Sequence, residues 1–437
     1  MILHEKIQAQ LPEWRERIKK LTKDYSEVKV AEVNIGQIIG GMRDIKSLLT
    51  DVSFVDPAEG IRLRGMSIPE TLAALPKPAG AEMPYVGGLY YLLMVGEVPT
   101  KEQAEEVEAE WVKRSTIPPY VFDMLRDMPK HTHPMTLFIL AIQSLEIQSE
   151  FVRRYQEGMK KDVYWEAALE DSLNLTAELS EVAAFIYNLK YKDGKQPEVD
   201  PKLDYGANFA KMLGVENQKE YADLSRLYFI LHSDHESGNV SAHATHLVGS
   251  SLSDIYYAFS AGMCGLAGPL HGLANQECLG WLLSVHTKFG GVPSRDDLYK
   301  FAWDTLNGGK VIPGYGHAVL RVPDPRFTAQ MEFAKKHFPE DELVRLADLV
   351  FDVVPAVLKE QGKAKNPAPN VDAISGSLQY HYGVREFDFY TVLFGVGRAL
   401  GVTANYVWAR ALGQPLERPK SLTTKMLEDI AAKAGAQ

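Results

Sequence analysis

Cysteine is scarce in this chain, since Cys264 and Cys278 are its only two cysteines. With no Cys-x-x-Cys spacing between them, they exclude a disulfide framework and a zinc–thiolate site, and they are typical of a reduced, intracellular protein. Long apolar runs are also missing. The longest one, at residues 256–274, is interrupted by glycines, Pro269 and His271, so it does not predict a membrane span.

Excess positive charge is missing as well, because the formal net charge is −10. This value argues against nucleic acid and anionic membranes as partners. The length of 437 residues exceeds the size at which a single core keeps growing, so we expect two domains. An acidic protein can still bind an anionic substrate through a local group of arginines, and the sequence contains such arginines.

The hydrophobic periodicity is helical along most of the chain, which predicts a mainly α fold. Capping-box patterns begin at Ser67 and Thr100. Short extended segments are expected at residues 28–39, 53–55 and 61–64. Long helical stretches are predicted at residues 135–160, 165–191, 224–236, 242–263 and 269–288, and a closing helix pair at residues 389–412.

Composition also predicts where the two domains meet. A small domain is expected at residues 272–380, between a Gly/Ala-rich stretch at 261–268 and the region of Gly383. The large domain then comprises residues 1–271 and 381–437. Both hinges lie near the chemically interesting stretches described next, so we expect the site in the crevice between the domains.

His271 follows Gly-Pro-Leu at residues 268–270, a pattern that favours the first turn of a helix. The positive end of that helix would lower the pKa of the imidazole and keep it neutral, as an electrophile that donates N–H to a carbonyl oxygen requires. The alternative is a histidine that only caps a buried turn.

His317 ends the stretch Pro-Gly-Tyr-Gly-His at residues 313–317, where two glycines let the backbone approach a ligand closely. A plain turn is the alternative. Arg321 and Arg326 follow, and prolines on both sides of Asp324 would aim Arg326 at a carboxylate in a bidentate manner.

Asp372 follows a rigid, proline-containing segment at residues 366–371 and precedes a helix start. As a general base it would need partial desolvation to raise its pKa, and closure of a domain would provide it. The alternative is an ordinary helix N-cap.

Two further features concern anion binding. His232, His235, His243 and His246 form the densest histidine group, which favours either a metal site or, with Asn239 and Ser241, anion binding by His235. Arg398 follows Phe394 in an apolar helix, where an unpaired charge is costly, so it meets either a bound anion or an internal acid. Arg418 alone would be read as a surface residue.

Four of these stretches resemble motifs of the citrate synthase family, and they occur in the same order. They lie at residues 233–254, 265–275, 311–326 and 365–376. The resemblance runs from residues 40–43 to residues 416–420 and is to the long, animal-mitochondrial type. It implies an almost all-α homodimer with a large domain and a small domain that closes over the substrates.

The resemblance also implies a role for each residue. Asp372 would remove a methyl proton from acetyl-CoA, His271 would stabilise the enol, and His317 would activate the ketone of oxaloacetate. His235, Arg326 and Arg398 would hold the oxaloacetate carboxylates, with Arg418 contributed by the second subunit. Asn239, Ser241 and Phe394 complete the expected substrate site.

For CoA, the resemblance implies phosphate contacts by Arg43 and Arg321 and adenine contacts by the backbone of residues 311–319. This chain has Lys160 and Lys161 where the family usually has arginine, which weakens bidentate phosphate binding. Lys161 is expected to act across the dimer interface. The full expected CoA set is Arg43, Lys161, Val311, Gly314, Tyr315, Gly316, Ala318, Arg321, Lys365 and Asn370.

The resulting prediction is a citrate synthase that needs no metal and no cofactor beyond its CoA substrate. The rival enzyme is 2-methylcitrate synthase, which uses propionyl-CoA. A metallohydrolase built on the histidine group and a non-catalytic CoA-binding protein are the alternatives from other classes. Glu5, Glu13 and Glu16 depart from the acid-poor pattern of a transit peptide, so we expect a bacterial cytoplasmic protein, with a processed mitochondrial matrix form as the alternative.

Overall fold

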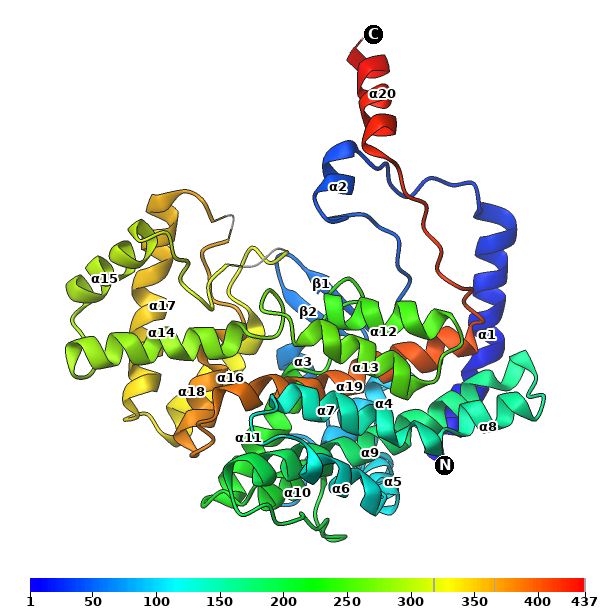
Figure 1. The fold of residues 1–437 in the computed structure, drawn as a ribbon, viewed down its shortest axis with the longest axis horizontal. Coiled ribbons are helices and arrows are strands. Elements are labelled where there is room, and N and C mark those ends of the chain that lie inside the picture. Colours follow the sequence, from blue (N-terminus) through cyan, green and yellow to red (C-terminus); the bar gives the residue numbers. More distant parts are fainter. Residues whose placement is uncertain (317–318, 365, 436–437) are drawn as a thin grey trace.

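The computed structural model describes residues 1–316, 319–364 and 366–435, and these form a mainly helical fold (Figure 1). The helices of the first half are α1 (Ile2–Tyr25), α2 (Ile35–Ile39), α3 (Ile68–Ala74), α4 (Val86–Val95), α5 (Lys101–Arg114), α6 (Pro119–Asp127), α7 (Pro134–Ser144), η1 (Leu145–Gln148), α8 (Glu150–Gln156), η2 (Lys161–Val163), α9 (Tyr164–Tyr191) and α10 (Tyr205–Leu213). Those of the second half are α11 (Gln218–Leu231), α12 (Val240–Ser250), α13 (Ile255–Leu266), α14 (Ala274–Phe289), α15 (Arg295–Asn307), α16 (Pro325–His337), α17 (Glu342–Gln361), α18 (Asp372–His381), α19 (Phe387–Ala411) and α20 (Thr424–Gly435).

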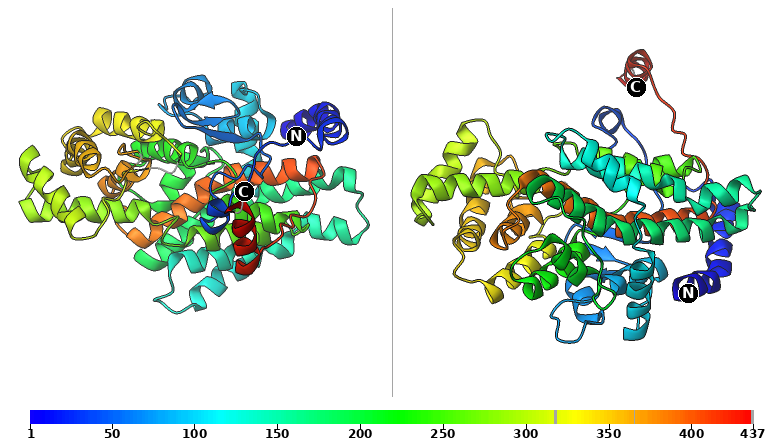
Figure 2. Two further views of the ribbon diagram at one scale, coloured as in Figure 1. Left: turned by 90° about the horizontal axis from the view of Figure 1, so that it is seen from above. Right: turned by 60° about the horizontal axis from the view of Figure 1, so that its bottom comes forward.

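The long helices α9 and α19 pack against each other through the middle of the molecule (Figure 2). Nearly every residue of both helices between their ends is buried, so their apolar residues face neighbours on all sides rather than on one stripe. Helices α4, α7, α11, α12 and α13 surround α19. Helices α14–α18 pack on one another and form the group at the left of Figure 1.

A small antiparallel sheet combines β1 (Ser53–Asp56), β2 (Gly60–Leu63) and β3 (Met66–Ser67) in that order. Its register pairs Ser53 with Leu63 and Asp56 with Gly60. The two extended segments expected at residues 53–55 and 61–64 are therefore confirmed. The capping boxes at Ser67 and Thr100 are confirmed too, because each side chain accepts the backbone N–H three residues later.

Several predicted boundaries are wrong. Residues 28–39 form a loop followed by the short helix α2 instead of a strand. The stretch at 242–263 is divided into α12 and α13, because Leu252 has a positive φ of 67° and Asp254 caps α13. The predicted helix at 224–236 begins earlier, at Gln218, and ends at Leu231, and the closing helix pair is the single helix α19.

One stretch, Pro134–Gln156, is long and apolar enough to cross a membrane by length and composition alone. In the fold it consists of three successive short helices, α7, η1 and α8, and these pack against α9 and α13. The apolar side chains of this stretch therefore contribute to the core.

Two arms extend from the body of the protein. One comprises residues 26–51 with α2, and the other comprises residues 413–435 with α20 (Figures 1 and 2). Both arms expose large apolar side chains, which are Val28, Val30, Val33, Ile38, Ile39, Met42 and Leu49 in the first and Leu416, Leu422, Met426 and Ile430 in the second.

Candidate active site

The segment that precedes His317 and the segment that precedes Asp372 are joined by a short β-bridge. Gly316 N–H donates to the Ala368 carbonyl at 3.0 Å, and Asn370 N–H donates to the Gly314 carbonyl at 2.9 Å. Gly314 has a φ of 80°, and a Cβ there would lie 2.8 Å from the Sγ of Cys278, so glycine is required. His317, Ala318 and Lys365 lie outside the described residues.

Asp372 is the first residue of α18, and its carboxylate is not the helix cap. The N-cap position is Val371, which makes no side-chain cap, and the Asn370 Oδ1 accepts the Asp372 backbone N–H at 3.0 Å. Burial raises the pKa of the Asp372 carboxyl to about 6, although the positive charge of Arg326 opposes this rise. The desolvation that a carboxylate base requires is therefore already present in this conformation.

His271 lies on the turn between α13 and α14, and its ring is oriented by Ser241. The Ser241 backbone N–H donates to His271 Nε2 at 3.2 Å, and the Ser241 Oγ lies 2.9 Å from the same atom. Because a backbone N–H can only donate, Nε2 is an acceptor, and the proton of the neutral ring lies on Nδ1. Burial lowers the pKa of His271 to about 4, and the positive charge of Arg398 adds to this effect.

This geometry corrects the expected helix end. Helix α14 begins at Ala274, so His271 precedes it instead of lying in its first turn. The helix N-terminus that contacts the imidazole is that of α12, because Ser241 is in the first turn of α12. The turn between α13 and α14 does hold His271, but its ring is directed to a backbone N–H from a different helix.

Arg398 is a buried cation held by neutral groups. Its side chain is 1% exposed, and its Nη1 donates to Asn239 Oδ1 at 2.7 Å and to Ser241 Oγ at 3.2 Å. Its Nε donates to the His232 carbonyl at 3.5 Å, so the hydrogen-bond partners of Arg398 among the described residues are neutral oxygens and not a carboxylate. Burial lowers the pKa of Arg398 to about 10, and its guanidinium lies 4.9 Å from the ring centre of Phe394.

A buried guanidinium with neutral partners is suited to an anionic ligand. Arg398 also acts on both candidate catalytic groups, because its positive charge lowers the pKa values of His271 and Asp372. Arg398 therefore lies within electrostatic reach of both His271 and Asp372.

The loop that carries His235 runs from α11 to α12. Asn239 Nδ2 donates to the carbonyls of His235 and Glu236, at 3.0 Å each, while its Oδ1 caps α12 by accepting Ala242 N–H at 3.1 Å. Asn239 thus connects the His235 loop to α12 and to Arg398. The structure brings His235, Asn239, Ser241, His271 and Arg398 into one network.

Arg326 forms the expected bidentate pair, but its partner is a carboxylate of the chain. Its Nε lies 3.0 Å from Asp324 Oδ1, and its Nη2 lies 2.7 Å from Asp324 Oδ2. Both side chains are buried. The sequence predicted Asp324 only as part of a stiff loop. In the structure Asp324 also caps α16, because its Oδ1 accepts the Arg326 backbone N–H.

The expected CoA residues are divided between two regions. Val311 is 78% exposed, Arg321 Nη1 donates to the Val319 and Leu320 carbonyls, and Tyr315 is part of the β-bridge. In contrast, Arg43 lies in the first arm, Lys161 begins η2, and Arg418 lies in the second arm.

The four histidines of the dense group do not converge. His232 Nδ1 lies 2.8 Å from the Tyr228 carbonyl, whereas His243 and His246 approach Glu417 at 3.4 and 3.0 Å. Across residues 1–316, 319–364 and 366–435, no three His, Cys, Asp or Glu side chains are grouped as metal ligands.

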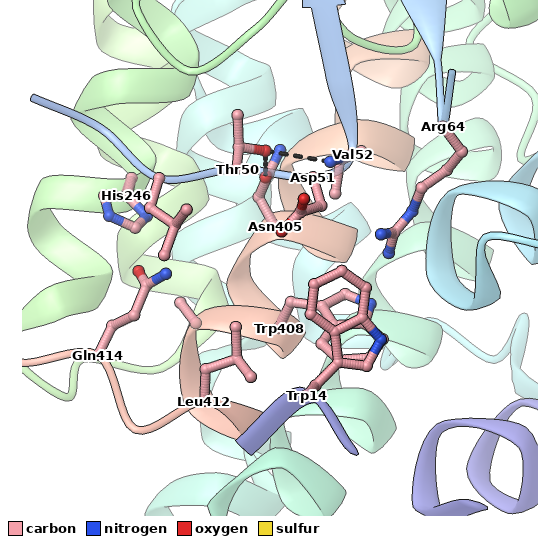
Figure 3. Close-up of a pocket in the computed structure, with 12 residues that line it drawn as sticks. Trp14, Thr50, Asp51, Val52, Arg64, His246, Asn405, Trp408, Leu412 and Gln414 are labelled. Atoms are coloured by element: carbon pink, nitrogen blue, oxygen red, sulfur yellow. Dashed lines mark hydrogen bonds between the residues drawn. The ribbon is translucent and has the colours of Figure 1, made fainter. Parts of the chain in front are cut away.

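A separate cavity lies where α1 meets α19 and the segment before β1 (Figure 3). Thr50 Oγ1 donates to Asn405 Oδ1 at 2.5 Å on one side, and the indole rings of Trp14 and Trp408 lie on the other. Arg64 also lines this cavity, and burial lowers its pKa to about 10. None of the residues expected in the catalytic site lines it.

Known proteins resemble this chain along most of its length. Residues 41–420 match the family model described as "Citrate synthase, C-terminal domain". The chain belongs to the citrate synthase family. Curated relatives include the probable mitochondrial citrate synthase of Glossina morsitans morsitans, 51% identical over 99% of this chain and 93% of the relative, and the mitochondrial citrate synthase of Daucus carota, 50% identical over 99% and 91%.

Solved structures share the fold. The citrate synthase of Pyrobaculum aerophilum has a TM-score of 0.76 and 25% identity over 88% of this chain and 92% of that one. The citrate synthase of Thermoplasma acidophilum, solved as a ternary complex with carboxymethyl coenzyme A and oxaloacetate, has a TM-score of 0.74 and 22% identity over 90% and 97%. The mainly α, citrate synthase-like fold predicted from the sequence is therefore confirmed. The chain is an enzyme of this family, and neither a metallohydrolase nor 2-methylcitrate synthase is favoured.

The expected bacterial cytoplasmic location is wrong, because these curated relatives are named as mitochondrial proteins. The expectation was based on the acidic residues of the first segment. In the structure that segment is α1, whose Leu3, Ile7 and Leu11 are buried in the core, so its charges reflect an exposed helix face and carry no information on location.

Proposed function

We propose that this chain condenses acetyl-CoA with oxaloacetate and hydrolyses the resulting citryl-CoA to citrate and CoA, with Asp372, His271 and His317 as its catalytic residues. Two groups in different states carry the proposal: a neutral His271, whose Nε2 accepts the Ser241 N–H, and a buried Asp372, whose pKa is raised to about 6. An acid and a base with shifted pKa values are what enol chemistry at neutral pH requires.

In the first step, the Asp372 carboxylate takes a proton from the acetyl methyl group, and His271 donates its Nδ1–H to the thioester oxygen. Negative charge develops on that oxygen, and a fixed N–H donor stabilises it. The enol carbon then attacks the oxaloacetate ketone, and His317 protonates the alkoxide. Water finally cleaves the thioester, and this step releases CoA as a thiol.

The oxaloacetate dianion would be held by His235, Arg326 and Arg398, with Asn239, Ser241 and Phe394 around them. The buried Arg398 supports this assignment, because its described partners are neutral. Val311, Gly314, Tyr315, Gly316, Ala318, Arg321, Lys365 and Asn370 would contact CoA. These residues and the two substrates suffice for the chemistry, so we assign no cofactor and no metal.

A homodimer completes this site in our proposal, with Arg418 and Lys161 contributed by the second subunit. Arg43, in the first arm, would also contact CoA. The support for the homodimer is the set of exposed apolar side chains on both arms. We further propose that residues 272–380 move as a small domain over residues 1–271 and 381–437. The names of the relatives favour the mitochondrial matrix as the location.

The test is release of CoA thiol from acetyl-CoA, measured with and without oxaloacetate. We expect release that depends on oxaloacetate and is slower with propionyl-CoA. Equal or faster release from propionyl-CoA would favour 2-methylcitrate synthesis. Release that is independent of oxaloacetate, or absent with both thioesters, would contradict the proposed function.

A further inference from the structure

The β1–β2 hairpin contacts the loop that carries His235. Ser53 Oγ donates to Asp234 Oδ2 at 2.7 Å and accepts the Glu236 backbone N–H at 2.8 Å. Ser53 and Asp234 are 4% and 0% exposed, so water does not compete for these bonds. One hydroxyl therefore holds the residues on both sides of His235.

A second bond from the same strand holds the loop through a side chain. Val55 N–H donates to Glu236 Oε1 at 2.7 Å. Glu236 has a positive φ of 55°, a conformation that a non-glycine residue keeps only where its surroundings impose it. The Glu236 carbonyl in turn accepts Asn239 Nδ2, and Asn239 Oδ1 accepts Arg398. A continuous chain of hydrogen bonds thus leads from the hairpin to the buried guanidinium.

The turn of the same hairpin contacts the segment that carries Arg326. The Pro57 carbonyl accepts the Arg321 backbone N–H at 2.8 Å. A Cβ placed on Gly60 would lie 2.4 Å from the Cγ of Pro325, which shows that the hairpin backbone packs directly on the residue before Arg326. One small element therefore contacts both segments that supply oxaloacetate ligands in the proposed function.

We infer that the β1–β2 hairpin is the frame of the oxaloacetate site, and that Ser53 and Glu236 are positioning residues that fix His235 and Asn239. This inference rests on the proposed function. Neither side chain is assigned to touch a substrate; each acts by fixing the backbone that presents His235 and Asn239. Losing one of these bonds leaves the fold intact but lets the loop leave the conformation that binds the dianion.

The experiment compares steady-state kinetics of the wild type with Ser53→Ala, Glu236→Ala and Glu236→Gln. Ser53→Ala removes both bonds to the loop, and Glu236→Ala removes the acceptor of Val55 N–H. Glu236→Gln keeps an acceptor oxygen at the same position and serves as the matched control. We expect KM for oxaloacetate to rise roughly tenfold in Glu236→Ala, the effect of losing one hydrogen bond, and at least as much in Ser53→Ala, which loses two.

Three further readouts separate positioning from general damage. KM for acetyl-CoA should stay within about twofold, because His271 and residues 311–316 keep their contacts. Glu236→Gln should restore most of the affinity for oxaloacetate. The shift of the melting temperature by saturating oxaloacetate should shrink in the alanine variants and recover in Glu236→Gln.

The inference is overturned if KM for oxaloacetate stays within twofold of wild type in both alanine variants, or if Glu236→Gln behaves like Glu236→Ala. An equal rise of both KM values would also overturn it, since a generally loosened fold predicts that result. If Ser53→Ala fails to fold, the comparison of Glu236→Ala with Glu236→Gln decides alone, because Glu236 is only half-buried. An inactive wild type would instead contradict the proposed function.

Discussion

Replacing Asp372 with asparagine should remove catalysis and at the same time stabilise the fold at neutral pH. Burial raises the pKa of this carboxyl from 3.8 to about 6, so the folded protein disfavours the ionised form that catalysis needs. A tenfold change in an acid constant corresponds to about 1.4 kcal/mol, and the ionised group therefore costs the folded state about 3 kcal/mol at pH 8.

The direction of this pH dependence follows from the pH at which the folded and the unfolded chain each lose the Asp372 proton. Below pH 3.8 the carboxyl is protonated in the folded and unfolded chains, and it has no effect on the free energy of unfolding. As the pH rises from there, the unfolded chain ionises first, so stability falls until the folded group ionises at about pH 6. The stabilisation of Asp372→Asn should thus decline from about 3 kcal/mol at pH 8 to about half of that at pH 5.

The assay is urea unfolding of both proteins at one protein concentration and at several pH values between 5 and 8. The control is Asp123→Asn, at a side chain that is 70% exposed, which should change the free energy of unfolding by no more than about 0.5 kcal/mol. Equal stability of wild type and Asp372→Asn at pH 8, or a gain that grows as the pH falls, would refute the argument from burial.

Three other predictions concern the same site. The ratio kcat/KM should fall about tenfold per pH unit below pH 6 as Asp372 is protonated, and a flat profile contradicts the assignment of Asp372. No second break is expected above pH 5, because the pKa of His271 is about 4, and such a break contradicts a neutral His271. Arg398→Met should raise KM for oxaloacetate about 100-fold or more, and a normal KM refutes the anion site. Arg398→Lys should restore little of the affinity, because one ammonium replaces a guanidinium whose Nε bonds to the His232 carbonyl while its Nη1 bonds to Asn239 and Ser241; a normal KM in this variant refutes the anion site as well. Mixing inactive Arg418→Ala and Asp372→Asn proteins should restore activity through hybrid dimers, and no recovery after subunit exchange would show that Arg418 is not contributed by the second subunit.

Local patterns predicted the parts of the fold that depend on local interactions. The stretch at residues 165–191 was predicted as a helix and forms α9 from Tyr164 to Tyr191. The capping boxes at Ser67 and Thr100 also depend on contacts three residues apart. Residues 28–39 failed because alternating valines favour a strand only where a partner strand is available, and this segment lies in an exposed arm.

In the candidate site, too, local features were predictable and features that depend on distant residues were not. The residue types at 235, 271, 326, 372 and 398 mark anion and carbonyl chemistry in the sequence, and the structure groups them. Their electrostatic state was not predictable, because it depends on distant partners. The tautomer of His271 is set by Ser241, 30 residues away, and the His235 loop is held by Ser53, more than 180 residues away. Nothing local to either histidine indicates these partners.

The central claim is that Asp372 is the base that begins carbon–carbon bond formation. Oxaloacetate-dependent release of CoA thiol, measured at pH 8 for wild type and Asp372→Asn side by side, tests it most directly. We predict that kcat falls by about 1,000-fold or more in the variant while oxaloacetate still raises its melting temperature, because the arginine and histidine ligands remain. Turnover within tenfold of the wild type in a folded Asp372→Asn protein would contradict the claim.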